Sequence, residues 1–470
     1  MSARSWPAAY LAASVLVLGA LTAGGFMQPW NTPDTPSWLA TCHGSARVGI
    51  GCFAGPRFPL YRFVYDALTL GGALPGLLPW AQDGLFLAAG YALARSARAA
   101  GLSDTGAFAL ALALPASNML LIWGRAEVPE ILARAALLGA LAATVRTASR
   151  SACAGARMGA PVAAGLLTAI AFFLDPGQLP FMLVLPVLAL WLGAGLVPFR
   201  KSWRGAALLG VSALLPFLLV ASLRLATLND FNIVSFGGYD MSGMAAYMLT
   251  PATVARLPPD LRGAANGILA RRHTLIEAGV VPPVPGNSLG HRSLLSETIG
   301  YFDILARFYD VLLRGAVLPL RHSNESWVVF NARMQRLAFA TVRAQPVEYL
   351  AWVAAASARL VGRMLMLNLP FVLASAVAVF LALARVARPP MAVPGQDLRI
   401  LLGLTGAYTI GSGALACLVA FPAQRYVDGT GLLISAWPIY AALQLAARGE
   451  ASPQVSGEPA AVGVPSRRRR

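Results

Sequence analysis

The sequence predicts an all-α, polytopic membrane protein with about ten transmembrane helices, juxtamembrane helices in the first outer loop and a small helical outer domain. Two features of the composition lead to this fold class. Hydrophobic residues make up 57% of the 470 residues, and charged residues only 12%. Because a water-soluble domain carries about 25% charged residues, the composition excludes an ordinary soluble enzyme and a disordered chain.

The predicted spans are apolar runs that approach the length of about 20 residues needed for a helix to cross a bilayer. In chain order they are Ala9–Met27, Pro79–Ala94, Thr105–Trp123, Val128–Val145, Val162–Leu174, Leu179–Val197, Ala206–Leu225, Leu365–Leu383, Ile400–Phe421 and Gly431–Ala446. The fifth and sixth runs are separated only by Asp-Pro-Gly-Gln at 175–178, a composition typical of a turn.

Basic residues follow every second apolar run. The clusters are Arg95 and Arg98; Arg146, Arg150 and Arg157; Arg200, Lys201 and Arg204; Arg385, Arg388 and Arg399; and Arg448 with Arg467 to Arg470. Because positively charged loops stay cytoplasmic, both termini are predicted to be cytoplasmic. We expect a multi-pass protein of the bacterial inner membrane, surrounded by membrane lipids. The net charge of +17 is spread among loops rather than gathered in one patch, so no nucleic-acid partner is expected.

Two outer segments are too long and too mixed in composition to be turns. They divide the chain into an N-terminal transmembrane module, 1–228, with its first outer loop at 28–78; a periplasmic helical insertion, 229–362; and C-terminal transmembrane helices, 363–448. The remaining tail, 449–470, is rich in Gly, Pro, Ser and Ala and ends in four arginines, so we expect it to be a disordered, basic, cytoplasmic segment.

Two of the four cysteines, Cys42 and Cys52, lie close together in the first outer loop. An oxidising outer compartment favours a disulfide between them, and the alternative is a pair of free, buried thiols. The four histidines show no spacing typical of a metal site. The sequence therefore leaves the identity of any metal ligand open.

Polar residues gather at the ends of the runs that are predicted to face outward. They include Asp34, Arg57, Arg125, Glu127, Glu130, Arg425 and Tyr426. A carboxylate at such a level suits a general base or a ligand of a divalent cation, and arginine suits a phosphate. Simpler roles stay open: Asp34 as a turn or helix-capping residue, and Glu127 as an acid favoured by a helix dipole.

Five short segments carry a resemblance to a known family. They are PDTPSWL at 33–39, RFPLY at 57–61, Glu127, QPVEYL at 345–350 and QRY at 424–426. In order, spacing and predicted outer location, these segments resemble motifs of the bacterial GT-C superfamily of membrane glycosyltransferases. That superfamily includes the protein mannosyltransferases and the lipid A aminoarabinose transferase.

The resemblance implies a glycosyltransferase that uses a polyprenyl-phosphate-linked sugar as donor and a lipid, polysaccharide or protein as acceptor. Asp34 would be the base or the group that orients the acceptor, and Glu127 would support it or help to bind a divalent cation, which is the one cofactor left open. Arg57 and Arg425, with Tyr426, would hold the donor phosphate. The insertion at 229–362 would cover the cavity and select the acceptor.

The chain also departs from the family pattern. Thr35 follows Asp34 where protein mannosyltransferases pair two acids, and Trp38 stands where tyrosine is more usual. Other classes of function remain as alternatives: a transporter or flippase of lipid-linked sugars, a non-catalytic scaffold for envelope assembly, or a ligase of polysaccharide chains. A transporter would require polar residues or broken helices near the middle of the membrane, for which the best positions are Asn118, Pro115 and Pro186, and these are few.

Overall fold

The computed structural model describes residues 6–40, 42, 49–149, 154–194, 199–281, 311–384, 394–419 and 424–447. Within these ranges every regular element is a helix, and the only β-type pairing is an isolated bridge between Trp30 and Ala126. The predicted all-α class is therefore confirmed. The predicted basic tail, 449–470, lies outside the described residues.

The first half of the chain forms a series of helices of very different lengths. They are α1 (Trp6–Ala23), α2 (Thr35–Leu39), η2 (Gly49–Ala54), α3 (Leu60–Thr69), α4 (Leu77–Ala99), α5 (Asp104–Leu112), η3 (Met119–Trp123), α6 (Glu130–Ala148), α7 (Ala154–Leu174), η4 (Pro176–Gln178), α8 (Phe181–Gly193) and α9 (Phe199–Leu228).

The second half begins with short helices and returns to long ones. They are α10 (Gly237–Met248), α11 (Pro251–Arg256), α12 (Pro259–Glu277), η6 (Leu313–Val317), η7 (Leu318–Leu320), α14 (Trp327–Ala344), α15 (Pro346–Met366), α16 (Leu369–Leu383), α17 (Gly395–Leu418), α18 (Gln424–Thr430) and α19 (Ala436–Ala447).

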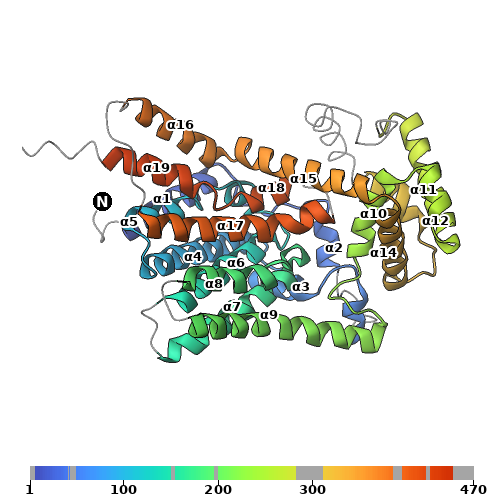
Figure 1. Cartoon of the computed structure of the whole chain (residues 1–470), viewed down its shortest axis with the longest axis horizontal. Helices are drawn as coiled ribbons and strands as arrows, with labels where there is room; N and C mark the ends of the chain where they lie inside the picture. Colours follow the sequence, from blue (N-terminus) through green and yellow to red (C-terminus); the bar gives the residue numbers. More distant parts are fainter. Residues whose placement is uncertain are drawn as a thin grey trace, which may run out of the picture.

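The long helices run along the length of the molecule, and α10, α11, α12 and α14 gather at the end away from the N-terminus (Figure 1). Helix α6 lies at the centre of the bundle, because nearly all of its side chains are buried and it packs against both α4 and α7. A bundle in which one helix is apolar on all sides, with its neighbours exposing large apolar residues outward, is typical of a membrane domain.

Five helical segments among the described residues are long and apolar enough to cross a membrane. They are α1, α6, Pro176–Gly193, Ser202–Leu228 and α17. A sixth candidate is the pair of α15 and α16, which bends by 64° at the break between them. These helices support a membrane protein, but the ten predicted spans are not confirmed.

The other predicted spans are shorter, broken or more polar than expected. Helix α4 carries Gln82 and Asp83 in its buried face. Helix α5 ends at Leu112, shortly before Pro115, and the rest of that run is a turn followed by the π-helical segment η3. Helix α19 has only 12 residues because the chain before it, from Gly431, forms turns. A proline or a turn inside an apolar run interrupts the helix without changing its composition.

The insertion has a hydrophobic core of its own. Residues between Tyr239 and Leu337, from α10, α12, η6 and α14, form one buried cluster that is separate from the core of the bundle. The Asn331 side chain links two of these helices, because its Oδ1 accepts hydrogen bonds from the backbone N–H groups of Gly238 (2.8 Å) and Tyr239 (3.1 Å). Helix α15 runs without a break through the predicted boundary at 362, so it joins the insertion directly to the bundle.

The helix ends that the arginine pattern predicts to be cytoplasmic lie together. Arg146 Nε donates to Ser96 Oγ at 2.9 Å, which joins α6 to α4. Asp397 at the start of α17 accepts from the Ser103 backbone N–H and from the Tyr440 hydroxyl, both at 2.8 Å. This shared end agrees with the alternation read from the sequence, while the side of the membrane that it faces stays a prediction.

The close packing of α7 and α9 gives a test of the bundle. A Cβ on Gly165 would lie 2.5 Å from Ser212 Cβ and 2.8 Å from the Leu209 carbonyl oxygen, whereas a Cβ on Gly159 of the same helix would meet nothing within 4 Å. We expect Gly165→Ala to cost about 1–3 kcal/mol through overpacking and to lower the unfolding temperature of the purified protein in detergent. Gly159→Ala should leave it unchanged or raise it, because alanine is the better helix former. Equal effects of the two changes would contradict the packing.

Candidate functional site

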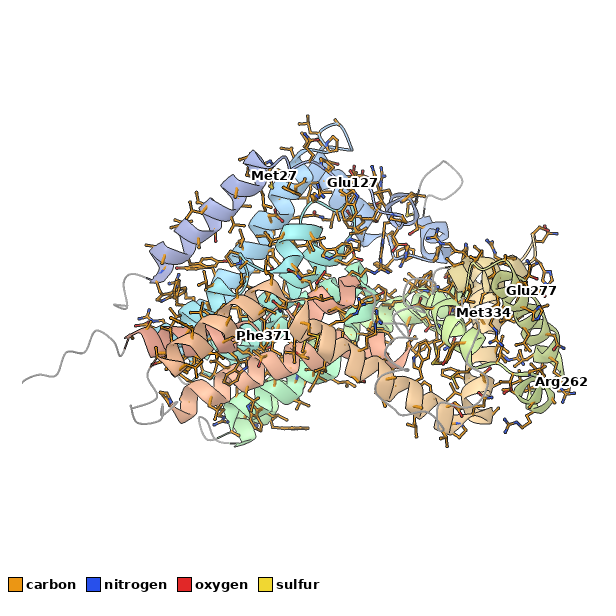
Figure 2. The ribbon with its side chains drawn as sticks, turned by 90° about the horizontal axis from the view of Figure 1, so that it is seen from above. Met27, Glu127, Arg262, Glu277, Met334 and Phe371 are labelled. Carbon is orange, nitrogen blue, oxygen red and sulfur yellow. A yellow bond between two sulfur atoms is a disulfide. The ribbon has the colours of Figure 1, made fainter. Side chains whose placement is uncertain are left out.

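The first outer loop is held against the turn that precedes α6. The Trp30 backbone N–H donates to the Arg125 carbonyl at 2.8 Å, and the Glu127 N–H donates to the Trp30 carbonyl at 3.0 Å. Figure 2 shows Met27, at the start of this loop, and Glu127 at the same end of the bundle. This pairing sets the position at which α2 begins.

Asp34 stands immediately before α2 but does not cap it. Its side chain makes no capping hydrogen bond, so the alternative of a helix-capping aspartate is not what the structure has. The loop is instead fixed by Thr32 and Thr35, since the Thr32 N–H donates to Thr35 Oγ1 at 2.9 Å. The Asp34 carboxylate is thereby left to make contacts outside its own helix.

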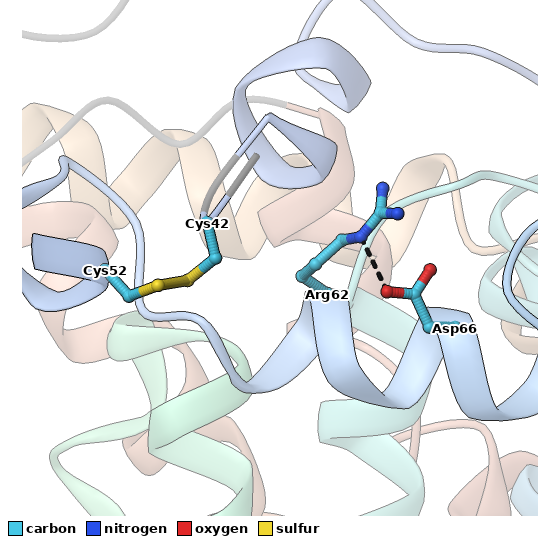
Figure 3. The surroundings of a disulfide bond; sticks show 4 residues. All are labelled: Cys42, Cys52, Arg62 and Asp66. Atoms are coloured by element: carbon cyan, nitrogen blue, oxygen red, sulfur yellow. Dashed lines mark hydrogen bonds and ion pairs between the residues drawn. A yellow bond between two sulfur atoms is a disulfide. The ribbon is translucent and has the colours of Figure 1, made fainter. Parts of the chain in front are cut away.

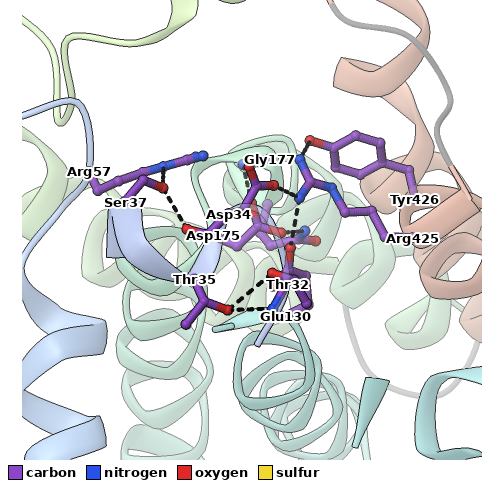
Figure 4. A network of polar contacts seen from close by, with 11 residues as sticks. Thr32, Asp34, Thr35, Ser37, Arg57, Glu130, Asp175, Gly177, Arg425 and Tyr426 are labelled. Carbon is purple, nitrogen blue, oxygen red and sulfur yellow. Dashed lines mark hydrogen bonds and ion pairs between the residues drawn. The ribbon is translucent and has the colours of Figure 1, made fainter. Parts of the chain in front are cut away.

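Arg425 joins three parts of the chain that are far apart in sequence (Figure 4). Its Nη1 donates to Asp34 Oδ2 and lies 3.5 Å from Glu130 Oε1, and its Nη2 donates to the Tyr426 hydroxyl at 3.3 Å. The loop before α2, the start of α6 and helix α18 therefore meet at one guanidinium group. Two of the predicted phosphate-binding residues and the predicted catalytic aspartate lie in this cluster.

The electrostatics of the cluster keep Asp34 ionised. Burial by itself would raise the pKa of Asp34, but the charges of Arg425 and Arg57, with the hydrogen bond from Arg425, outweigh burial and hold that pKa below its ordinary value. A carboxylate in this state is a ready hydrogen-bond acceptor. When another anion also binds the neighbouring arginines, their effect on Asp34 weakens, and the carboxylate becomes a stronger base.

Arg57 is positioned by two aromatic rings. Its guanidinium carbon lies 4.4 Å from the ring centre of Trp38 and 4.4 Å from that of Phe236. Its Nε donates to Ser37 Oγ at 3.3 Å, and Ser37 Oγ in turn donates to the Asp34 carbonyl at 2.7 Å. The two terminal nitrogens of Arg57 have no hydrogen-bond partner within the described chain. Stacking between rings removes side-chain freedom while leaving these donors available.

The structure brings Glu130, rather than Glu127, to the arginine. Glu127 is only 5% exposed and hydrogen-bonds to Tyr65 of α3, and burial raises the pKa of its carboxyl above the ordinary value. Glu127 therefore lies among the aromatic residues under the first loop, where it packs the loop against the bundle. The sequence marked both acids as candidates for a helix start, and only the fold distinguishes them.

Three functional candidates were missed by sequence reasoning. Arg134 in α6 donates through Nη1 to Gln178 Oε1 at 2.7 Å and to Ser412 Oγ at 2.8 Å. Gln178 Nε2 donates to Asp175 Oδ2 at 2.6 Å. The sequence did contain a signal, since Arg134 is a charged residue inside a predicted apolar span, where charges are costly and usually functional. Asp175 and Gln178 were interpreted only as turn residues.

A cavity of about 370 Å³ opens beside this cluster. Its polar wall includes Arg57, Asp175, Gln178, Asp240, Gln335 and Tyr426. The segment from Asn232 to Gly237 forms another part of the wall, and α9 and α17 supply apolar residues. A largely apolar cavity with a few convergent polar groups is the usual form of a small-molecule site.

The remaining predicted features lie at the edge of the site. Cys42 and Cys52 form a disulfide, and Arg62 pairs with Asp66 at 2.8 Å on α3 (Figure 3). No group of three or more His, Cys, Asp or Glu side chains suited to a metal ion occurs among the described residues. The carboxylates of Asp34 and Glu130 both lie against Arg425 Nη1.

Comparisons with known proteins add no identification. No protein-family model, curated protein or solved structure matches the chain. The chemistry of the site is therefore argued from its own residues.

A double-mutant cycle tests the ion pair at the centre of the site. Removing either charge, by Asp34→Asn or Arg425→Gln, should lower the unfolding temperature, and the double variant should lose less than the sum, with a coupling of about 0.5–3 kcal/mol. Because the pKa of Asp34 is depressed from 3.8 in the folded state, the coupling should be present above that value and disappear as the pH falls through the depressed pKa.

The control is the pair Arg336 and Asp260, which is more than half exposed and should show weaker coupling. If the effects of Asp34→Asn and Arg425→Gln add at neutral pH, the ion pair does not hold the loop.

Proposed function

We propose that the chain is a GT-C type glycosyltransferase that moves a sugar from a polyprenyl-phosphate donor to an acceptor at the outer face of the bacterial inner membrane. The observation that carries this proposal is the pair of arginines beside Asp34. Arg57 is clamped between two rings with free donors at a cavity, and Arg425 already holds an anionic oxygen. Such an arrangement is suited to a phosphate.

The proposed reaction uses Asp34 and the arginines in turn. The donor phosphate competes with Asp34 for Arg425 and occupies the free donors of Arg57, which releases the Asp34 carboxylate. Asp34 then accepts the proton of an acceptor hydroxyl or amine as that atom bonds to the anomeric carbon of the sugar. The bond from this carbon to the phosphate oxygen breaks, and the charge that develops on the leaving phosphate is stabilised by Arg57 and Arg425.

Other residues have supporting roles in this proposal. Glu130 keeps Arg425 in place, Glu127 packs the first loop, and Tyr426 accepts a hydrogen bond from Arg425. No step is assigned to a divalent cation, because Arg425 separates the Asp34 and Glu130 carboxylates and holds Asp34. The insertion, whose α10 lines the cavity through Asp240 and Met241, is proposed to select a lipid, polysaccharide or protein acceptor.

A transporter or flippase of lipid-linked sugars is the second candidate, and one feature favours it. The break between α15 and α16 lies beside a partly buried polar network in which Asn118 Nδ2 donates to the Leu367 carbonyl (2.8 Å) and to Asp428 Oδ1 (3.1 Å). Broken helices with polar residues are typical of transporter sites. A scaffold without catalytic activity would tolerate the loss of Asp34.

The test compares the lipid-linked sugar pools of cells that lack the protein with those of cells that express the wild type, Asp34→Asn or the control Asp260→Asn. For a transferase, we expect one polyprenyl-phosphate sugar to accumulate by tenfold or more in the null strain and with Asp34→Asn, and to stay at wild-type levels with Asp260→Asn. Mass spectrometry of the lipid extract gives both the amount and the identity of the sugar.

The outcomes separate the candidates. Accumulation in the null strain but not with Asp34→Asn removes Asp34 from the chemistry and favours transport or a scaffold. No change in any strain contradicts the proposed donor class.

A further inference from the structure

We propose that Asp175 is a specificity-determining residue that accepts hydrogen bonds from hydroxyl groups of the donor sugar, and that Arg134 and Gln178 are positioning residues for it. This inference rests on the proposed function. It adds that the phosphate and the sugar of the donor contact two different parts of the cavity wall.

The chain of contacts begins at a buried arginine. Arg134 is 1% exposed and has no ion-pair partner within the described residues. Its Nη1 donates to Gln178 and Ser412, both of which line the cavity, and its Nε has no hydrogen-bond partner among the described residues. A Cβ on Gly429 would lie 2.6 Å from Arg134 Nη2, so helix α18 presses directly on the guanidinium. A buried charge held this closely fixes the groups that it contacts.

Gln178 links Arg134 to Asp175 through hydrogen bonds. The amide is 1% exposed, with Oε1 accepting from Arg134 and Nε2 donating to Asp175 Oδ2. The other oxygen, Oδ1, accepts from the Gly177 backbone N–H at 3.0 Å (Figure 4). Each carboxylate oxygen is therefore tied by one donor, and the carboxylate cannot rotate without breaking both hydrogen bonds.

The remaining lone pairs of Asp175 determine the kind of ligand. An ionised carboxylate has about four acceptor sites, and two of them are used. Asp175 lines the cavity and has no arginine or lysine within ion-pair distance among the described residues. Its remaining acceptor sites can accept hydrogen bonds from hydroxyl groups and disfavour the phosphodiester of the donor, which is an anion with no proton to donate at neutral pH.

The cavity therefore has two chemically distinct regions. Arg57, whose terminal nitrogens have no hydrogen-bond partner among the described residues, offers donors to an anion, and Asp175 offers acceptors to hydroxyl groups. A sugar phosphate carries both kinds of group within one small molecule. The geometry places its phosphate at Arg57 and its sugar ring at Asp175, with the anomeric carbon between them.

Binding of lipid probes to the purified full-length protein tests this assignment. The probes are undecaprenyl phosphate without a sugar and a panel of undecaprenyl-phosphate hexoses and pentoses, measured by native mass spectrometry. We expect the wild type to bind one sugar-bearing probe more tightly than the bare lipid. Asp175→Asn should reduce that preference about tenfold or more, because a site built for a hydroxyl loses a charged acceptor, while affinity for the bare lipid changes less than twofold.

Three further variants distinguish positioning from a structural role. Gln178→Leu should lower the sugar preference in the same direction as Asp175→Asn, at an unchanged affinity for the bare lipid. Arg57→Ala should weaken the binding of bare and sugar-bearing probes alike. Asp260→Asn, which alters an exposed acid of the insertion that does not line the cavity, is the control and should behave as wild type.

The results separate this inference from the proposed function. If the wild type binds no probe, the proposed function and the inference fail together. If it prefers a sugar-bearing probe and Asp175→Asn keeps that preference, the inference is overturned while the proposed donor class stands. If Asp175→Asn weakens the bare lipid as strongly as the sugar-bearing one, Asp175 supports the fold of the cavity and does not contact the sugar.

Discussion

The organisation of the site depends on one guanidinium group. Arg425, at the start of α18, reaches Asp34 before α2 and Glu130 at the start of α6. Both acids would be costly to place at the end of an apolar bundle if they were unpaired. Arg425 lowers the free-energy cost of placing these carboxylates there only while all three segments stay together. The same ion pairs therefore hold the three segments in contact beside the cavity. The same contact has to open when another anion binds.

A second arginine, the buried Arg134, contacts the same short helix, α18. Arg425 lies at one end of this short helix, and Gly429, one turn later, packs against Arg134. Arg425 donates to the Asp34 carboxylate of the first loop, whereas the hydrogen-bond partners of Arg134 among the described residues, Gln178 and Ser412, are neutral. Because both arginines touch α18, the position of the first loop and the orientation of Asp175 are coupled through one helix. A side chain in place of Gly429 would separate them.

The sequence predicted the features that depend on composition and on the order of charges along the chain. It was less informative about the features that depend on contacts between residues far apart in sequence. Apolar runs and alternating arginines predicted a helical membrane protein, and Asp34, Arg425 and Tyr426 were named before the structure placed them in one network. Glu127 and Glu130 could not be distinguished, because both lie near the start of the same predicted span, and only the contacts of Glu127 with Tyr65 and of Glu130 with Arg425 separate them. The number of spans could not be predicted from composition, because turns and π-helical segments interrupt runs that are apolar throughout.

The two ends of the cavity are formed by different parts of the chain. Stacking Arg57 between Trp38 and Phe236 joins the first loop to the segment before α10, so the insertion takes part in forming the end of the cavity at which we propose that the phosphate binds. The other end is formed by the α7–η4 turn and by α17, which belong to the bundle. A ligand that spans both ends would therefore bind the insertion to the bundle. Helix α15 is continuous from the insertion into the bundle, and it ends at the bend to α16, beside the polar network around Asp428. One helix therefore joins the part of the chain that forms one end of the cavity to the bent helix pair.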